Sequence, residues 1–231
     1  MHSENALLQK ERGGMLTFKL AKEARSALTV LCLGAHSDDI EIGCGGTILR
    51  LLSEYEDVTV HWVVLGSKGQ RDAEAIESAE GFLTKAKQKN VIVKNFKESY
   101  FPHVGDEIKD FFEKLKREVS PDIVFSHYRH DLHQDHRVVS ELTWNTYREH
   151  VILEYEVIKY DGDLGSPNLF VHLNEEICGK KIRILMDSFK TQANRDWFTK
   201  DTFFSMLRIR GIESRAPEKY AEAFYCRKLV L

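Results

Sequence analysis

Residues 33–47 read LGAHSDDIEIGCGGT, and this stretch decides which fold the sequence predicts. An apolar run over residues 28–33 leads into it and predicts a buried strand. Its glycines allow a tight turn and close backbone approach, and a helical pattern follows over residues 46–54. His36, Asp38 and Asp39 therefore lie where a strand ends and a helix begins. Ligands of open α/β sheets bind at this end of the strands, so we expect half of a metal site here.

A second polar stretch, DLHQDH at residues 131–136, has the same setting. It follows an apolar strand expected at residues 122–126 and lies at the start of a helix expected at residues 135–150. Taken singly, such residues are typical of helix caps and solvated turns. The two stretches together contain four histidines and four aspartates: His36, His130, His133, His136, Asp38, Asp39, Asp131 and Asp135. We expect both stretches to meet at one edge of a parallel sheet and to share one metal ion.

Strand and helix patterns alternate along most of the chain. Strands are expected at residues 28–33, 58–65, 91–96 and 122–126, and helices at residues 46–54, 72–88, 105–119 and 135–150. Further strands are expected at residues 151–160, 168–173 and 223–231, and further helices at residues 175–190 and 198–209. This order predicts an α/β, Rossmann-like fold whose mainly parallel sheet has helices on both faces, with the metal site at the carboxyl ends of its strands. Residues 1–25 are expected to be an N-terminal extension, and residues 26–231 a single domain.

Composition excludes several classes of protein. The 231 residues are 42% hydrophobic and 30% charged, with a net charge of −3, which does not favour nucleic acid or a membrane surface as partner. No apolar run approaches the ~20 residues of a spanning helix, so we expect no membrane insertion. Residues 1–14 lack the apolar segment of a secretory signal. The four cysteines form no C-x-x-C pair, so we expect reduced thiols and a cytoplasmic location.

The residue types at the two stretches suit a catalytic metal. His36, Asp39 and His136 could supply three ligands, and three protein ligands with a position left for water are typical of catalytic zinc. Water bound there has a pKa of ~7, which makes hydroxide available at neutral pH. Asp38 and Asp39 cannot both ligate the ion and still leave that position, so one of them is free to act as general base.

Two neighbouring side chains could assist the reaction. His133 could stabilise an oxyanion or protonate a leaving amine. Asp135 could orient a histidine by accepting its second ring proton. His103, His127 and His172 are further histidines that could reach the site.

At these residues the sequence resembles the PIG-L/LmbE-like metal-dependent N-acetylglucosaminyl deacetylases. The first motif of that family, AHPDD with a glycine-rich continuation, stands here as AHSDD at residues 35–39 and GCGGT at residues 43–47. The second motif, H-x-D-H, stands as HQDH at residues 133–136. Weaker likeness extends through residues 71–74, 191–192 and 221–224. Ser37 replaces the usual proline, which would stiffen the turn by fixing φ.

The resemblance implies an activity: hydrolytic removal of the N-acetyl group from an N-acetylated amino sugar or its conjugate, by attack of metal-bound water. It implies these roles: His36, Asp39 and His136 as zinc ligands, Asp38 as general base, His133 as acid or oxyanion stabiliser, Asp135 as its support, and Arg71 as substrate contact. Ferrous iron is an alternative to zinc, since imidazole suits both. The resemblance further implies a small-molecule amino-sugar substrate and a homo-oligomer.

Two other functions stay open. One is an amidase that acts on a larger thiol or sugar conjugate. The other is a non-catalytic sugar- or nucleotide-binding module on a Rossmann-like sheet. Against the module, the sequence contains neither G-x-G-x-x-G nor the P-loop pattern, and a module has no need of Asp38 beside three metal ligands.

Overall fold

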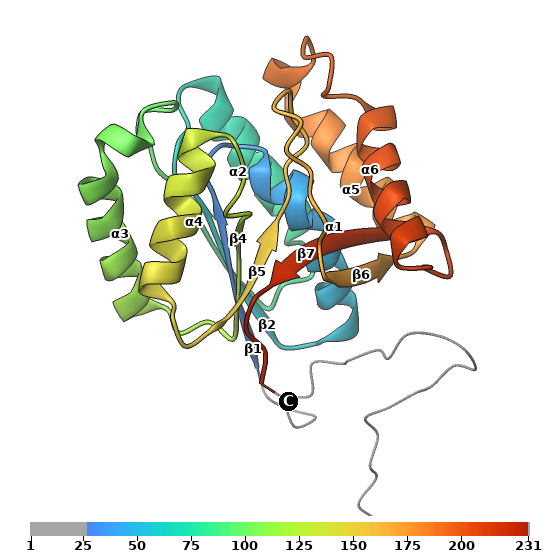
Figure 1. The fold of residues 1–231 in the computed structure, drawn as a ribbon, viewed down its shortest axis with the longest axis horizontal. Coiled ribbons are helices and arrows are strands. Elements are labelled where there is room, and N and C mark those ends of the chain that lie inside the picture. The colour runs from blue at the N-terminus through green and yellow to red at the C-terminus, as the bar shows by residue number, and fades with distance from the viewer. Residues whose placement is uncertain (1–26, 231) are drawn as a thin grey trace, which may run out of the picture.

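The computed structural model describes residues 27–230, so the extension expected over residues 1–25 lies outside the described residues. Within them, seven strands form one sheet in the order β3-β2-β1-β4-β5-β7-β6 (Figure 1). β1 to β5 pair in parallel, whereas β7 runs antiparallel to both β5 and β6. The strands are β1 (Leu28–Gly34), β2 (Val58–Val64), β3 (Gln88–Val93), β4 (Ile123–His127), β5 (Val151–Tyr155), β6 (Leu169–Leu173) and β7 (Tyr220–Cys226). The expected α/β fold with a mainly parallel sheet is confirmed.

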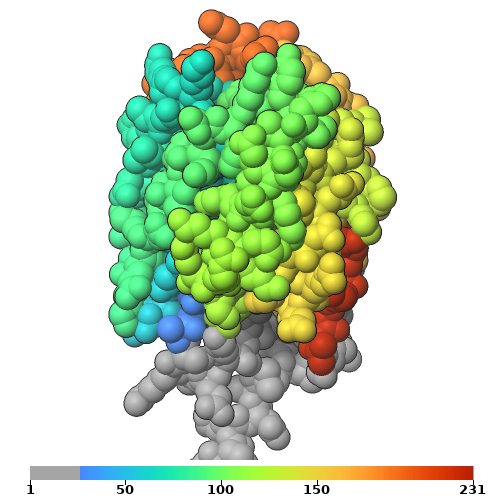
Figure 2. Space-filling view, turned by 90° about the vertical axis from the view of Figure 1, so that its left-hand side faces the viewer, coloured from blue at the N-terminus to red at the C-terminus, as the bar shows by residue number. Residues whose placement is uncertain are grey.

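Helices cover both faces of the sheet (Figure 1). The α-helices are α1 (Asp39–Glu54), α2 (Gln70–Phe82), α3 (Gly105–Glu118), α4 (Gln134–Thr146), α5 (Glu175–Ser188) and α6 (Lys200–Glu213). Figure 2 shows α3, in green, at the surface of the side that α3 and α4 cover. None of the helices in the described part of the chain has the length and apolar character needed to cross a membrane.

Alternate side chains of β1 enter two separate cores. Val30 and Cys32 pack with residues of α1, α2, α5 and α6, whereas Leu31 and Leu33 pack with residues of α3 and α4. The period of two along a strand places neighbours on opposite faces, and both faces of a parallel sheet are buried. This two-sided burial is why β1 reads as a continuous apolar run in the sequence.

The two polar stretches lie where the strand order reverses. β1 and β4 are neighbours in the sheet, and Val30 pairs with Ile123. β1 leads directly into α1, and β4 leads through a short loop into α4. Because both strands are parallel, their carboxyl ends open on the same edge, at the topological switch point where such folds bind ligands.

The glycines of the first motif lie within α1, which begins at Asp39, so the expected turn at these glycines is wrong. They serve close packing instead. A Cβ at Gly43 would lie 2.1 Å from Tyr155 Cδ2, and one at Gly45 would lie 2.6 Å from Phe82 Cε1. The predicted close approach of the backbone is therefore confirmed. It is the backbone of helix α1, and not of a turn, that packs closely against Tyr155 and Phe82.

Several other boundaries differ from the prediction. The strand expected at residues 91–96 is β3 at Gln88–Val93, and the helix expected to reach residue 88 ends at Phe82. β3 lies beside β2 at the edge of the sheet, and its first three residues are exposed and polar, which hides its pattern. The strand expected at residues 151–160 ends at Tyr155, and the returning strand β7 begins at Tyr220 rather than at residue 223.

Candidate metal centre

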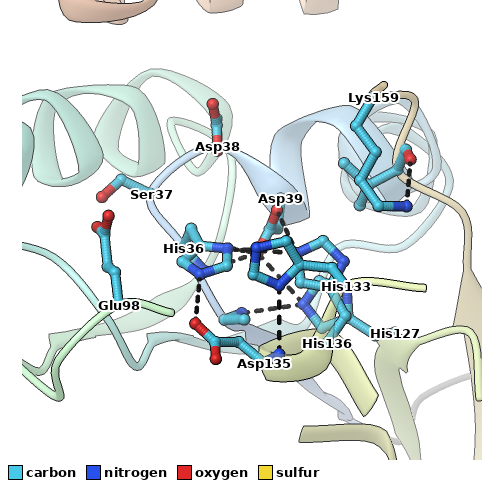
Figure 3. Close-up of polar contacts among 12 residues, drawn as sticks. His36, Ser37, Asp38, Asp39, Glu98, His127, His133, Asp135, His136 and Lys159 are labelled. Carbon is cyan, nitrogen blue, oxygen red and sulfur yellow. Dashed lines mark hydrogen bonds and ion pairs between the residues drawn. The ribbon is translucent and has the colours of Figure 1, made fainter. Parts of the chain in front are cut away.

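The loops after β1 and β4 bring their histidines together at the carboxyl edge of the sheet (Figure 3). His36 Nδ1 lies 3.2 Å from His136 Nε2, although the two residues are 100 positions apart in the sequence. Asp39, the first residue of α1, completes the group. Its Oδ2 lies 3.4 Å from His36 Nδ1, and its Oδ1 lies 3.4 Å from His136 Nε2. The three predicted ligands therefore converge.

Hydrogen bonds assign the tautomers of the two imidazoles. His36 Nε2 lies 3.0 Å from Asp135 Oδ2, and His136 Nδ1 lies 2.9 Å from Asp131 Oδ2. An ionised carboxylate only accepts, so each of these ring nitrogens carries the proton that it donates. When neutral, His36 Nδ1 and His136 Nε2 are then free of protons and face each other beside Asp39. A carboxylate behind each ligating imidazole is the usual support of a metal site.

The charges of this group favour a cation. Burial lowers the pKa of His36, but the charge of Asp39 and the hydrogen bonds to Asp135 and Asp39 outweigh it and raise that pKa to about 10. The pKa of His136 is raised as well, by the Asp39 charge and the Asp131 hydrogen bond against the effect of burial. A site that draws protons onto its imidazoles draws a divalent cation for the same electrostatic reason. The residues present therefore fit a divalent metal.

Two more histidines lie within reach of the same position. Ligand atoms of His36, His133 and His136 lie within 4.8 Å of one another, and so do those of Asp39, His127 and His136. His133 Nδ1 accepts from the Asp135 backbone N–H at 3.2 Å, which places the proton of neutral His133 on Nε2. If His133 bound a metal through Nδ1, it would lose the hydrogen bond from Asp135, and if it bound through Nε2, it would lose the ring proton. His133 is therefore better suited to donate a proton than to ligate a metal.

His127, the last residue of β4, is wholly buried and supports the other loop. Its Nε2 accepts from the Ala35 backbone N–H at 2.9 Å, so this lone pair is occupied. Its ring stacks on that of His136 with centroids 3.9 Å apart. Burial and the neighbouring His136 lower the pKa of His127 to about 4, so the ring is neutral. His127 thus fixes the residue just before His36.

Asp38 lies next to the three predicted ligands without sharing their contacts. It is the N-cap residue of α1, and its Oδ1 lies 3.5 Å from Arg71 Nη2. Burial and the charge of Asp39 raise the pKa of Asp38 to about 6, despite the opposing charge of Arg71. A buried carboxylate with a raised pKa beside a cation site is suited to proton transfer.

Arg71 and Glu98 form a polar pair at the edge of this site. Arg71 Nη1 lies 3.3 Å from Glu98 Oε2, and both side chains remain partly exposed. A guanidinium and a carboxylate side by side offer both donors and acceptors to a polyhydroxylated ligand. The predicted substrate contact Arg71 is thus brought to the site, and Glu98 joins it.

Ser37 stands where the family motif has proline, and a hydrogen bond holds it. Its Oγ donates to Ser67 Oγ at 2.9 Å, and both residues are buried. The His36 backbone N–H also donates to Asp39 Oδ2 at 2.6 Å. These two bonds constrain the turn that proline would stiffen by its ring.

Comparison with known proteins assigns the chain to a family. The sequence model of one family, PIG-L (GlcNAc-PI de-N-acetylase), matches residues 31–147, about half of the chain, and includes both polar stretches. This chain belongs to the PIG-L family. The matched range includes His36, Asp38, Asp39 and His136.

Solved structures share the fold. The conserved protein TT1542 from Thermus thermophilus is 21% identical over 88% of this chain and 96% of its own, with a TM-score of 0.68. The 4-carboxy-2-hydroxymuconate hydratase GalB from Pseudomonas putida is 16% identical over 88% of this chain and 98% of its own, with a TM-score of 0.67. The N,N'-diacetylchitobiose deacetylase from Pyrococcus horikoshii is 20% identical over 87% of this chain and 84% of its own, with a TM-score of 0.59. At these identities the likeness is one of fold.

The structure separates the further histidine candidates. His127 reaches the site, whereas His103 packs beside Tyr100 and His172 lies on the edge strand β6. His127 is the last residue of an apolar strand, and that position was its only sequence signal. Glu98 carried no signal, because it lies in an irregular loop outside both motifs.

The carboxylate of Asp135 has a different neighbour from the one that the resemblance implied. It accepts from His36 Nε2 and from the backbone N–H groups of Ser99 and Phe101. It is the backbone N–H of Asp135, not its carboxylate, that bonds to His133. Asp135 thus orients one imidazole with its side chain and another with its main chain.

Proposed function

We propose that this PIG-L protein is a divalent-metal-dependent N-deacetylase that hydrolyses the acetamide of an N-acetylated amino sugar or its conjugate. The observation that carries the proposal is the meeting of His36 Nδ1, His136 Nε2 and the Asp39 carboxylate, with Asp38 and His133 beside them. The fold alone does not carry it, because the structures of similar fold include a hydratase as well as a deacetylase.

In this proposal His36, Asp39 and His136 hold the ion, and zinc and ferrous iron both suit such ligands. A bound divalent ion supplies a water of lowered pKa and polarises the acetamide carbonyl. Asp38 accepts a proton from the attacking water as the C–O bond forms. His133 donates from Nε2 to the oxygen that gains charge or to the nitrogen that leaves. The C–N bond breaks, and the products are acetate and the free amine.

Substrate recognition is assigned to Arg71 with Glu98, since their charged groups match the hydroxyls of a sugar ring. The four cysteines are all unpaired thiols, which supports the cytoplasmic location that we propose. The substrate is a small molecule in this proposal, and sedimentation of the purified protein tests whether it assembles as a homo-oligomer.

The test is a screen for acetate release from free N-acetylglucosamine and from its conjugates, with zinc or ferrous iron and with a chelator. The proposal expects release that the chelator abolishes and added metal restores. Release of other acids from conjugates only would favour the larger-conjugate amidase. Sugar binding with neither metal nor turnover would favour the binding module and overturn the proposal.

A variant tests the role of Asp38. Asp38→Asn should keep the metal and lose about 10²-fold or more in kcat, the size of a general-base contribution. Asp57→Asn is the matched control, because the Asp57 side chain is 39% exposed and pairs with Lys87 at the surface. Turnover of Asp38→Asn at the wild-type rate would exclude Asp38 as base.

A further inference from the structure

We propose that Lys159, on the connection between β5 and β6, is a positioning residue for His136 and acts through Asp131. The inference rests on the ligand role proposed above for His136. Neither sequence motif includes residue 159, and the sequence pattern assigned it only to the end of an expected strand.

Lys159 is largely enclosed and lies among carboxylates. Its side chain is 9% exposed, and its Nζ lies 3.0 Å from Asp131 Oδ2 and 2.6 Å from Asp163 Oδ2. Asp131 and Asp163 are only 3% and 7% exposed. Lysine is rarely buried unless it is paired, because the ammonium gives up its hydration. Figure 3 shows Lys159 on the opposite side of the histidine group from Ser37 and Glu98.

Asp131 connects this ammonium to the metal centre. Its Oδ2 accepts both from Lys159 and from His136 Nδ1, at 3.0 and 2.9 Å, and its Oδ1 accepts from the His133 backbone N–H at 2.8 Å. One carboxylate thus orients the imidazole of a ligand and the backbone of the proposed proton donor. Three donors fix its orientation. His133 lies at the end of the loop after β4 and His136 in α4, whereas Lys159 comes from the separate connection between β5 and β6.

Asp163 makes a second contact between the β5–β6 connection and the loop that follows β4. Its Oδ2 accepts from the Leu132 backbone N–H at 2.7 Å as well as from Lys159. The segment from Lys159 to Asp163 therefore holds the loop by two contacts, one to the Asp131 side chain and one to the Leu132 backbone. Removal of the ammonium would leave buried Asp131 and largely enclosed Asp163 close together without their shared cation, and Asp131 would be free to turn away from His136.

The experiment measures the His136 Nδ1–H and the metal affinity separately. The ring proton is observed in ¹⁵N-histidine-labelled protein and assigned by its absence from His136→Asn. Its exchange with solvent reports the bond to Asp131, in metal-free and in zinc-loaded protein alike. Zinc affinity is measured by competition with a chromophoric chelator.

Lys159→Met should accelerate exchange of the His136 Nδ1–H at least tenfold and weaken zinc binding about tenfold, the lower end for partners of metal ligands. Lys159→Arg should restore both, because it returns the charge to the carboxylates. Lys114→Met, at an exposed position of α3, is the matched control and should change neither. A merely structural role would lower the melting temperature of Lys159→Met without altering the exchange of this one proton.

Unchanged exchange and zinc affinity in folded Lys159→Met would overturn the inference. Where Lys159→Met does not fold, Asp163→Asn decides: it loosens Lys159 and should accelerate the same exchange, and no change there overturns the inference too. Because the proton is read in metal-free protein, failure of every deacetylation assay would defeat the proposed activity and leave this result standing.

Discussion

Replacement of Gly43 by alanine tests whether close packing of α1 positions Asp39, the proposed metal ligand. The new Cβ would lie 2.1, 2.4 and 2.8 Å from Tyr155 Cδ2, Cγ and Cε2. Tyr155 is wholly buried, and its hydroxyl donates to the Leu33 carbonyl at 2.7 Å. The ring cannot retreat without losing that bond, so the strain must move α1, whose first residue is Asp39.

The magnitude follows from three effects. Overpacking costs about 1–3 kcal/mol, and loss of the Tyr155 bond adds about 1 kcal/mol. The better helix propensity of alanine returns about 1 kcal/mol. The free energy of unfolding should therefore fall by about 2 kcal/mol, which is about 4–8 °C in melting temperature for a chain of this size.

Gly179→Ala is the matched control, because Gly179 lies within α5 and nothing lies within 4 Å of its added Cβ. This variant should be more stable than wild type by about 0.5–1 kcal/mol. Urea unfolding of both variants measures the difference, and chelator competition should show weaker zinc binding for Gly43→Ala alone. Equal gains in stability at the two positions would refute the packing argument.

Three further predictions concern the site and its supports. Asp131→Asn should weaken zinc binding 10–100-fold, because the carboxylate charge behind His136 Nδ1 is lost and only a neutral amide oxygen can accept there; isothermal titration measures the affinity, and an unchanged value would show that the charge of Asp131 does not support His136. Arg71→Met should raise KM for the sugar and leave zinc affinity unchanged; steady-state kinetics with chelator competition would show the reverse pattern if Arg71 only supported the metal ligands. Lys181→Met should lower the free energy of unfolding by about 3–5 kcal/mol, because it removes the cation that pairs with buried Glu222 and the donor to the Ile42 carbonyl; urea unfolding within about 1 kcal/mol of wild type would contradict this.

The sequence predicted the parts of the fold that are buried from both sides. β1 and β4 lie in the middle of a parallel sheet, so nearly every side chain is apolar or small and the strands read directly as apolar runs. The edge strand β3 begins with exposed polar residues and was displaced in the prediction. The start of α1 was missed because glycine has low helix propensity, so residues 43–45 did not look helical. Glycine is needed at residue 43 because the Tyr155 ring, distant in the sequence, packs against the helix there.

At the site, the sequence predicted which residues meet but not how they are connected. Two strand ends at one sheet edge were enough to expect His36, Asp39 and His136 together. Spacing carries no information on side-chain direction, so it could not show that Asp135 faces His36. His127 and Lys159 lie outside the motifs and reach the site only through the tertiary fold.

Anomalous diffraction at the zinc edge, from crystals of the zinc-loaded protein, would locate the ion among these side chains. We predict one peak at about 2.0–2.2 Å from His36 Nδ1, His136 Nε2 and an Asp39 oxygen, the ordinary bond lengths of zinc. A peak bonded to His127 or His133 in place of His36 or His136, or no peak among these residues, would contradict it.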